Sequence, residues 1–269
     1  MAAFACFILF SCGPEQPAKD KKPAGTQVEK RTPLIPFTVV NKFPHDTTAY
    51  TEGFLFHNNL LMESTGAPEY LPYARSTFGF VDLETGKLNV KVEIDKQKYF
   101  GEGIVVLNNL LYQLTYTNQV GFLYDAKTFQ KKGQFNYANK EGWGLTTDGK
   151  YLIMSDGTNI LTFLDPIDQK VIKTLQVSEN GYASDRLNEL EFIKGYIYAN
   201  LWMTNTIVKI DPTSGQVVEK MEMDELVVES RAKHKSSLEM NGIAYDSIND
   251  KVLVTGKFWP YIYEIKFNR

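Results

Sequence analysis

The sequence predicts an all-β fold, a five-bladed β-propeller with four antiparallel strands per blade. Three observations support this: a repeated block of strands, hairpin signals inside each block, and one extra strand near the N-terminus that closes the ring. The blocks recur five times in the 269 residues, and equivalent positions at their starts are 50, 41, 46 and 52 residues apart. Repeats of roughly 40–50 residues that consist only of strands are typical of propellers. These positions are Gly53, Gly103, Gly144, Leu190 and Gly242.

The first two strands of each block form a predicted hairpin. Asn, Asp and Gly, which tolerate the backbone angles of tight turns, stand between the two strands. The turns lie at residues 57–59, 108–109, 147–149, 194–195 and 247–250. The second strands follow at residues 60–64, 110–114, 151–155, 196–200 and 251–255.

The third strand of four blocks ends in an Asp-containing turn, and a fourth strand follows each turn. These Asp side chains accept backbone N–H bonds two residues further on, so we interpret them as structural. The fourth strands lie at residues 88–92, 132–135, 171–175 and 217–221. The fifth block stops at its third strand, and the unassigned strand 37–41 completes it as the outermost strand. The propeller then extends over residues 34–269, with a short helix expected over 224–235.

The N-terminal residues resemble a bacterial lipoprotein signal. Residues 1–12 form the signal segment, in which Cys12 becomes the lipidated mature N-terminus, and the Pro- and Lys-rich residues 13–33 form a disordered tether. The segment lacks the basic residues that open a signal peptide, so we expect the natural start upstream of Met1. The expected localisation is a cell-envelope membrane, on the periplasmic or surface side, through this lipid anchor.

The composition is that of a globular domain, with 43% hydrophobic and 23% charged residues. The net charge of −3 gives no reason to expect nucleic acid as a partner. No phosphate-binding glycine loop, Cys/His metal cluster or nucleophile elbow occurs. We expect a monomer without metal or cofactor, and solvated roles for His57 and His234.

A ring of polar and aromatic side chains is expected at one mouth of the propeller. Antiparallel pairing brings the end of each second strand beside the start of the first. Carboxylates, an amide, an amine and aromatic rings around one opening are typical of an active site. A water-filled channel in a binding scaffold has similar residues, so catalysis and binding both remain open at this point. Glu191 and Asp156 are interpreted as ordinary strand-edge or turn acids. The expected ring consists of Glu52, Glu102, Trp143, Asn188, Glu189, Tyr116, Trp202 and Lys257.

The sequence resembles the plant-type glutaminyl-peptide cyclotransferases, five-bladed propellers of plants and bacteria. The resemblance extends from about Phe37 to Ile265 and includes the run Phe100-Gly101-Glu102-Gly103. It implies conversion of the N-terminal glutamine of peptides or proteins to pyroglutamate with release of ammonia, without a catalytic metal. The other matching segments are residues 44–46, 50–53, 63–66, 113–116, 141–145, 187–191, 199–202, 241–245 and 255–257.

The resemblance also implies roles for nine residues. Glu102 moves the proton from the attacking α-amine to the departing NH₂ group, and Lys257 and Asn188 stabilise the oxyanion. The remaining residues bind the substrate: Tyr50, Glu52, Phe100, Tyr116, Trp143 and Trp202. Two of them depart from the family pattern, because Glu52 stands where the family usually has Gln, and Tyr116 where it has Trp.

Two other functions are compatible with the residues themselves. A glycosidase could use Glu52 and Glu102 as a carboxylate pair across a sugar, although sugar hydrolysis does not need Lys257 beside them. A non-catalytic propeller could bind peptides or glycans and would retain binding without Glu102.

Overall fold

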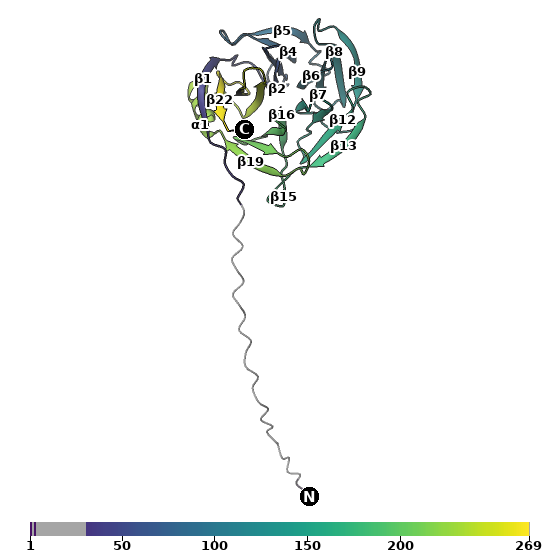
Figure 1. Cartoon of the computed structure of the whole chain (residues 1–269), viewed down its shortest axis with the longest axis vertical. Coiled ribbons are helices and arrows are strands. Elements are labelled where there is room, and N and C mark those ends of the chain that lie inside the picture. The colour runs from purple at the N-terminus through teal and green to yellow at the C-terminus, as the bar shows by residue number, and fades with distance from the viewer. Residues whose placement is uncertain (2, 4–30, 269) are drawn as a thin grey trace. The chain divides into compact units, whose positions relative to one another are not determined.

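The computed structural model describes residues 1, 3 and 31–268. Residues 31–268 contain five four-stranded antiparallel sheets arranged radially around a common axis, called the channel below, which confirms the predicted propeller (Figure 1). In each sheet the strand order follows the chain from the channel outward, except that the last sheet takes its outermost strand from the N-terminal side.

The strands of the first three blades have the following bounds. Blade 1 contains β2 (Thr51–His57), β3 (Leu60–Thr65), β4 (Thr77–Val81) and β5 (Leu88–Glu93). Blade 2 contains β6 (Gly101–Leu107), β7 (Leu110–Thr115), β8 (Val120–Asp125) and β9 (Lys131–Asn136). Blade 3 contains β10 (Leu145–Thr147), β11 (Leu152–Met154), β12 (Ile160–Leu164) and β13 (Val171–Gln176).

The last two blades are completed in different ways. Blade 4 contains β16 (Leu187–Ile193), β17 (Tyr196–Leu201), β18 (Thr206–Ile210) and β19 (Val217–Glu222). Blade 5 contains β20 (Met240–Asp246), β21 (Lys251–Gly256), β22 (Tyr261–Phe267) and, outermost, β1 (Phe37–Pro44). The pairing of β1 with β22 therefore closes the ring as the sequence predicts.

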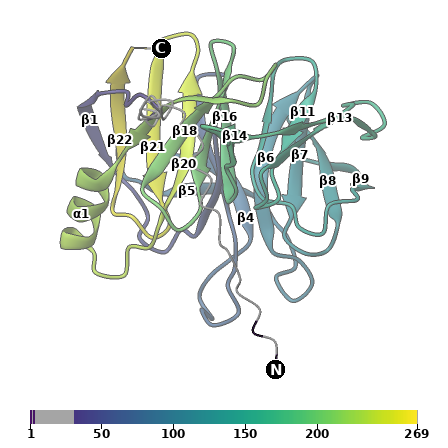
Figure 2. The same ribbon diagram turned by 90° about the horizontal axis from the view of Figure 1, so that it is seen from below.

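Two small elements lie outside the blades. A minor hairpin consists of β14 (Ser178–Glu179) and β15 (Tyr182–Ala183). The expected helix is α1 (Asp224–Lys233), which lies at the outer edge beside blade 5 (Figure 2). Leu226 and Val227 anchor it in the core between blades 4 and 5. Among the described residues, no helix combines the length and apolar character needed to cross a membrane.

Apolar packing between neighbouring blades holds the ring together. Each of the five core clusters combines residues from two adjacent blades, and so every junction has its own core. Large rings such as Tyr112, Tyr198 and Tyr263 are fully buried in these clusters. Each such side chain contributes roughly 1.5–3 kcal/mol through burial.

The innermost strands contain bulges at the mouth. Extra residues interrupt the regular pairing between Gly101 and Ile104 in β6, and between Leu187 and Leu190 in β16. Similar irregularities occur at the starts of β2 and β20. A bulge places two residues opposite one and changes the direction of side chains. The bulges therefore decide which residues face the mouth.

The described part of the predicted tether packs on the propeller. Thr32 is buried, and the carbonyl oxygen of Pro33 accepts a hydrogen bond from the backbone N–H of Lys220 at 3.0 Å. The prediction of a disordered tether through residue 33 is therefore wrong for Thr32 and Pro33. The predicted signal segment, Cys12 and the rest of the tether lie outside the described residues, apart from Met1 and Ala3.

Candidate active site

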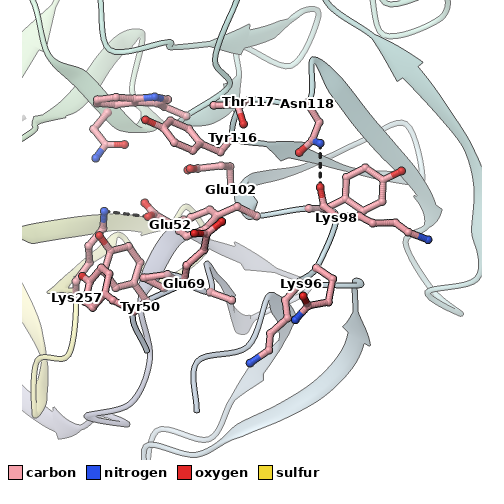
Figure 3. Close-up of a pocket in the computed structure, with 18 of the residues that line it drawn as sticks. Tyr50, Glu52, Glu69, Lys96, Lys98, Glu102, Tyr116, Thr117, Asn118 and Lys257 are labelled. Carbon is pink, nitrogen blue, oxygen red and sulfur yellow. Dashed lines mark hydrogen bonds and ion pairs between the residues drawn. The ribbon is translucent and has the colours of Figure 1, made fainter. Parts of the chain in front are cut away.

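A cavity of about 480 Å³ opens at the mouth of the channel (Figure 3). The structure brings together in it all nine residues to which the family resemblance assigns a role. Their roles remain predictions, but their convergence on one cavity is a property of the fold. These residues are Tyr50, Glu52, Phe100, Glu102, Tyr116, Trp143, Asn188, Trp202 and Lys257.

The residues reach the cavity from two kinds of strand end. Glu102 and Asn188 lie in the bulges of β6 and β16, at the starts of innermost strands. Tyr116, Trp202 and Lys257 each follow the last residue of a second strand. Antiparallel pairing places these two kinds of strand end side by side.

Hydrogen bonds between blades fix the two bulges. The Ser64 hydroxyl in blade 1 donates to the carbonyl oxygen of Glu102 in blade 2, at 2.6 Å. The Ser155 hydroxyl in blade 3 donates to the carbonyl oxygen of Asn188 in blade 4, at 2.7 Å. The backbone beneath Glu102 and Asn188 is thus set before a substrate binds, as electrostatic catalysis requires.

Lys257 lies between two carboxylates in the wall of the cavity. Its Nζ atom is 2.9 Å from Oε1 of Glu52 and 3.3 Å from Oε1 of Glu239. It also lies 4.3 Å from the centroid of the Tyr50 ring. The Asn241 side chain donates to the other oxygen of Glu52 at 3.0 Å. The ammonium group is buried yet held in one place, which suits a fixed electrostatic role.

Burial changes the protonation of the site. Burial, with the nearby charge of Glu52, raises the pKa of Glu102 well above its ordinary range. Burial raises the pKa of Glu52 to about 7, although the Lys257 ammonium opposes this shift. Burial alone lowers the pKa of Lys257, but Glu52, Tyr50 and Glu239 outweigh burial and raise it overall. Glu102 can therefore hold a proton near neutral pH, while Lys257 stays charged.

Aromatic rings form two walls of the cavity. Trp143 and Trp202 meet edge to face with their centroids 5.5 Å apart, and Glu141 accepts a hydrogen bond from the Trp143 indole at 2.9 Å. On the other side, the Phe100 ring packs against Tyr116 and lies so close to Gly66 that a Cβ there would be 2.1 Å from it. Any side chain at position 66 would displace the Phe100 ring from this wall.

Glu189 is absent from the cavity, contrary to its predicted place in the ring. Its carboxylate is buried in the channel and accepts hydrogen bonds from the backbone N–H groups of Phe54 and Ile243, at 3.2 and 2.8 Å. The reason is the bulge register: Glu189, and not Leu190, occupies the position equivalent to Gly53 and Gly103. Glu189 therefore joins blades 4, 5 and 1.

Two further interpretations were wrong. Glu191 is not an ordinary edge acid, because it accepts hydrogen bonds from the Tyr245 backbone N–H at 2.7 Å and the Thr146 hydroxyl at 3.4 Å, in blades 5 and 3. His234 is partly buried, and its Nδ1 atom bonds the carbonyl oxygen of Phe258 at 2.9 Å. Asp156 accepts bonds from Thr158 and Asn139, as expected of a turn acid.

Several residues that shape the site were not predicted from the sequence. Glu141 and Glu239 stand just before strand openings and contact Trp143 and Lys257, so their position in the repeat was an available signal. The outer part of the cavity is lined by loop residues that no repeat pattern reveals: Ala67, Pro68, Glu69, Tyr70, Lys96, Gln97, Lys98, Tyr99, Thr117 and Asn118. Among the described residues, no group of three or more His, Cys, Asp and Glu side chains is arranged to hold a metal ion.

Comparisons with known proteins identify the family of this chain. The chain matches the glutamine cyclotransferase family over residues 8–267. It is 38% identical over 251 residues to the glutaminyl-peptide cyclotransferase of Arabidopsis thaliana, covering 91% of this chain and 76% of that relative. Its structure is similar to that of glutaminyl cyclase from Myxococcus xanthus, with a TM-score of 0.78, 29% identity, and coverage of 88% of this chain and 98% of that one. The chain therefore belongs to the glutamine cyclotransferase family.

Proposed function

We propose that this protein is a glutaminyl-peptide cyclotransferase in which Glu102 transfers the proton and Lys257 with Asn188 stabilises the oxyanion. The α-amine of an N-terminal glutamine attacks its own side-chain amide, a C–N bond forms in the ring, and the bond to the amide nitrogen breaks to release ammonia. The observation that carries the assignment is the convergence of these three residues in one aromatic-walled cavity of a chain from this family.

Glu102 suits a proton shuttle because of its surroundings. Its raised pKa brings it toward the pKa of an α-amino group, about 7.7–8.0 in peptides. A carboxylate with a raised pKa is a stronger base toward the amine, and general acid–base catalysis typically contributes about 10²–10⁴ in rate. Glu102 takes a proton from the attacking nitrogen and gives one to the departing nitrogen, so it returns to its initial state.

Lys257 and Asn188 supply donors for the oxyanion. Both side chains line the cavity and are almost fully buried, with 3% of each residue exposed. The Lys257 ammonium keeps its charge because Glu52 and Glu239 flank it. Fixed donors of this kind stabilise charge that develops in the transition state without having to reorganise.

The aromatic walls supply the correct conformation. The reaction is intramolecular, so its rate depends on how often the glutamine side chain folds back toward its own amine. Trp143, Trp202 and Phe100 enclose the space in which that folded form fits. Holding reacting groups in a near-attack geometry can supply several kcal/mol of the barrier reduction.

The decisive experiment is ammonia release from a Gln-initiated dipeptide, measured for the wild type and the Glu102→Gln variant, with and without a chelator. We expect chelator-resistant turnover that the variant loses. No turnover by the folded wild type over a broad pH range would contradict the assignment and favour a binding propeller. The ion pair between Glu52 and Lys257 argues against a glycosidase, because it engages one of the two carboxylates that a glycosidase would need.

We also propose that the chain is an exported bacterial lipoprotein, anchored through Cys12, that acts as a monomer. The support is the sequence of residues 9–13 and the polar composition of the residues after them. Mass spectrometry of the protein purified from membranes should show a diacylglyceryl group on Cys12. A soluble Cys12→Ala variant with an unmodified N-terminus is the control, and an unlipidated wild type in the soluble fraction would overturn the proposal.

A further inference from the structure

The cavity is larger than the reaction centre. Its volume of about 480 Å³ falls in the range that proteins offer to drug-sized ligands, roughly 300–1,000 Å³. A single glutamine residue is much smaller than this. The cavity continues from Lys257 and Glu52 toward Lys98 and Asn118 on the opposite side (Figure 3). The outer part gives a peptide chain that is bound by its first residue a path out of the cavity.

Three loops form the outer part, and side chains tie them together. The loops connect β3 to β4, β5 to β6 and β7 to β8. The Asn118 side-chain amide donates to the carbonyl oxygen of Lys98 at 2.9 Å. The Lys96 ammonium donates to the carbonyl oxygens of Pro72 and Ala74, at 2.7 and 3.0 Å. These hydrogen bonds hold the three loops of the outer part in fixed positions.

The charged side chains of the outer part differ in their interaction partners. Lys96 is engaged by two carbonyl oxygens, and Lys98 lies 3.5 Å from the carboxylate of Asp95. Glu69 also lines the cavity. Its carboxylate has no hydrogen-bond or ion-pair partner within residues 31–268. Beside it, Tyr70 is 70% exposed and offers an aromatic face. Glu69 is therefore the charged side chain of the outer part that these interactions leave without a partner.

We propose that the outer part of the cavity is a subsite for the residue that follows the N-terminal glutamine, and that Glu69 gives this subsite a preference for a basic side chain. A Lys or Arg side chain can pair with Glu69 while its stem or charged group packs on the Tyr70 ring. The inference rests on the proposed function, because it assumes that the first residue reacts at Glu102. The preferred substrates are then peptides or proteins that begin with Gln followed by a basic residue.

The test compares kcat/KM for three amidated tripeptides, Gln-Lys-Ala, Gln-Ala-Ala and Gln-Glu-Ala. An exposed ion pair is worth little, so we expect the wild type to favour the Lys peptide over the Glu peptide by about two- to fivefold. Glu69→Gln should bring this ratio close to one, and Glu69→Lys should invert it. Raising the salt concentration should reduce the wild-type ratio, because exposed charges are screened.

Glu84→Gln is the matched control. Glu84 is also an exposed glutamate, but it lies in the turn between β4 and β5, at the blade end opposite the cavity. Its variant should keep the wild-type ratio. A ratio that stays at the wild-type value in Glu69→Gln would overturn the subsite, as would a wild type without preference. No turnover of any of the three peptides would instead overturn the proposed function, and the subsite with it.

Discussion

Two buried glutamates, Glu102 and Glu189, lie in equivalent bulges of blades 2 and 4 but have opposite surroundings. Glu102 occupies the first bulge position and faces the cavity, where the charges and burial around it raise its pKa. Glu189 occupies the second position and faces the channel, where two backbone N–H groups from neighbouring blades bind it. Both are almost fully buried. A buried carboxylate with donors from the backbone holds blades together, whereas one that faces an open cavity can exchange a proton with a substrate.

The sharpest test of this comparison is Glu102→Gln. We expect kcat to fall by about 10²–10⁴, because the amide has nearly the same shape but cannot shuttle a proton. The free energy of unfolding should not decrease, since the variant removes a buried ionisable group that the fold does not use. Steady-state kinetics and denaturant unfolding measure the two effects. A variant that also loses stability would show that Glu102, like Glu189, helps to hold the blades together.

Lys257→Met probes the cation that lies beside Glu52 in the wall of the cavity. It removes an oxyanion donor, so we expect kcat to fall by about 10²–10³. It also leaves Glu52 and Glu239 buried without their cation, which typically destabilises a protein by about 3–5 kcal/mol. The double variant Lys257→Met with Glu52→Gln is the control. It should regain stability but no activity, and recovery of activity would exclude the oxyanion role.

Glu189→Ala is expected to lower stability, which Glu102→Gln should leave unchanged. It leaves the N–H groups of Phe54 and Ile243 without their acceptor, at a cost of about 1–3 kcal/mol each. The melting temperature should fall by roughly 2–4 °C for each kcal/mol in a domain of this size. Differential scanning calorimetry measures the change. An unchanged melting temperature would show that the channel carboxylate does not hold the blades.

Glu52→Gln tests the electrostatic coupling inside the cavity. The negative charge of Glu52 contributes to the raised pKa of Glu102, so its removal should lower the pKa of Glu102. The acidic limb of the kcat/KM profile should then move to lower pH than in the wild type. The same peptide is used for both proteins, so titration of its amine cancels. A profile that does not move would mean that Glu102 does not govern the acidic limb.

His45→Gln tests a third buried carboxylate, Glu63, whose partner is the imidazole ring of His45. Both ring nitrogens of His45 face acceptors, Oε1 of Glu63 at 3.0 Å and the carbonyl oxygen of Trp259 at 2.9 Å. Burial lowers the pKa of His45, but Glu63 and the Trp259 carbonyl raise it overall.

A histidine with a raised pKa contributes stability that is fully present below its unfolded pKa of about 6.5 and is lost as the pH rises through the folded value. The wild-type free energy of unfolding should therefore decrease from pH 6 to pH 9 more steeply than that of His45→Gln. Denaturant unfolding over this pH range measures it. Parallel slopes would show that His45 is neutral in the folded protein.

The blades could be predicted from the sequence because their signals lie in short stretches of the chain. Turn residues such as Asp82 and Asn108 mark strand ends, and the apolar strands between them repeat at a nearly constant period. The closing strand followed from counting, because the fifth block lacked an outer strand. Glu69 and Lys96 could not be placed in this way, since they lie on irregular loops whose course depends on contacts with other loops.

The sequence by itself determined the five-bladed ring, its closure by β1, and the set of residues around Glu102, Asn188 and Lys257, because strand period and family motifs are local properties of the chain. Only the tertiary structure decided which bulge residue faces the cavity. One inserted residue moves a side chain from one face of a strand to the other. Asn188 thus faces the cavity and Glu189 the channel, although they are neighbours in the chain. The hydrogen bonds that select this register come from other blades, which the local sequence does not contain.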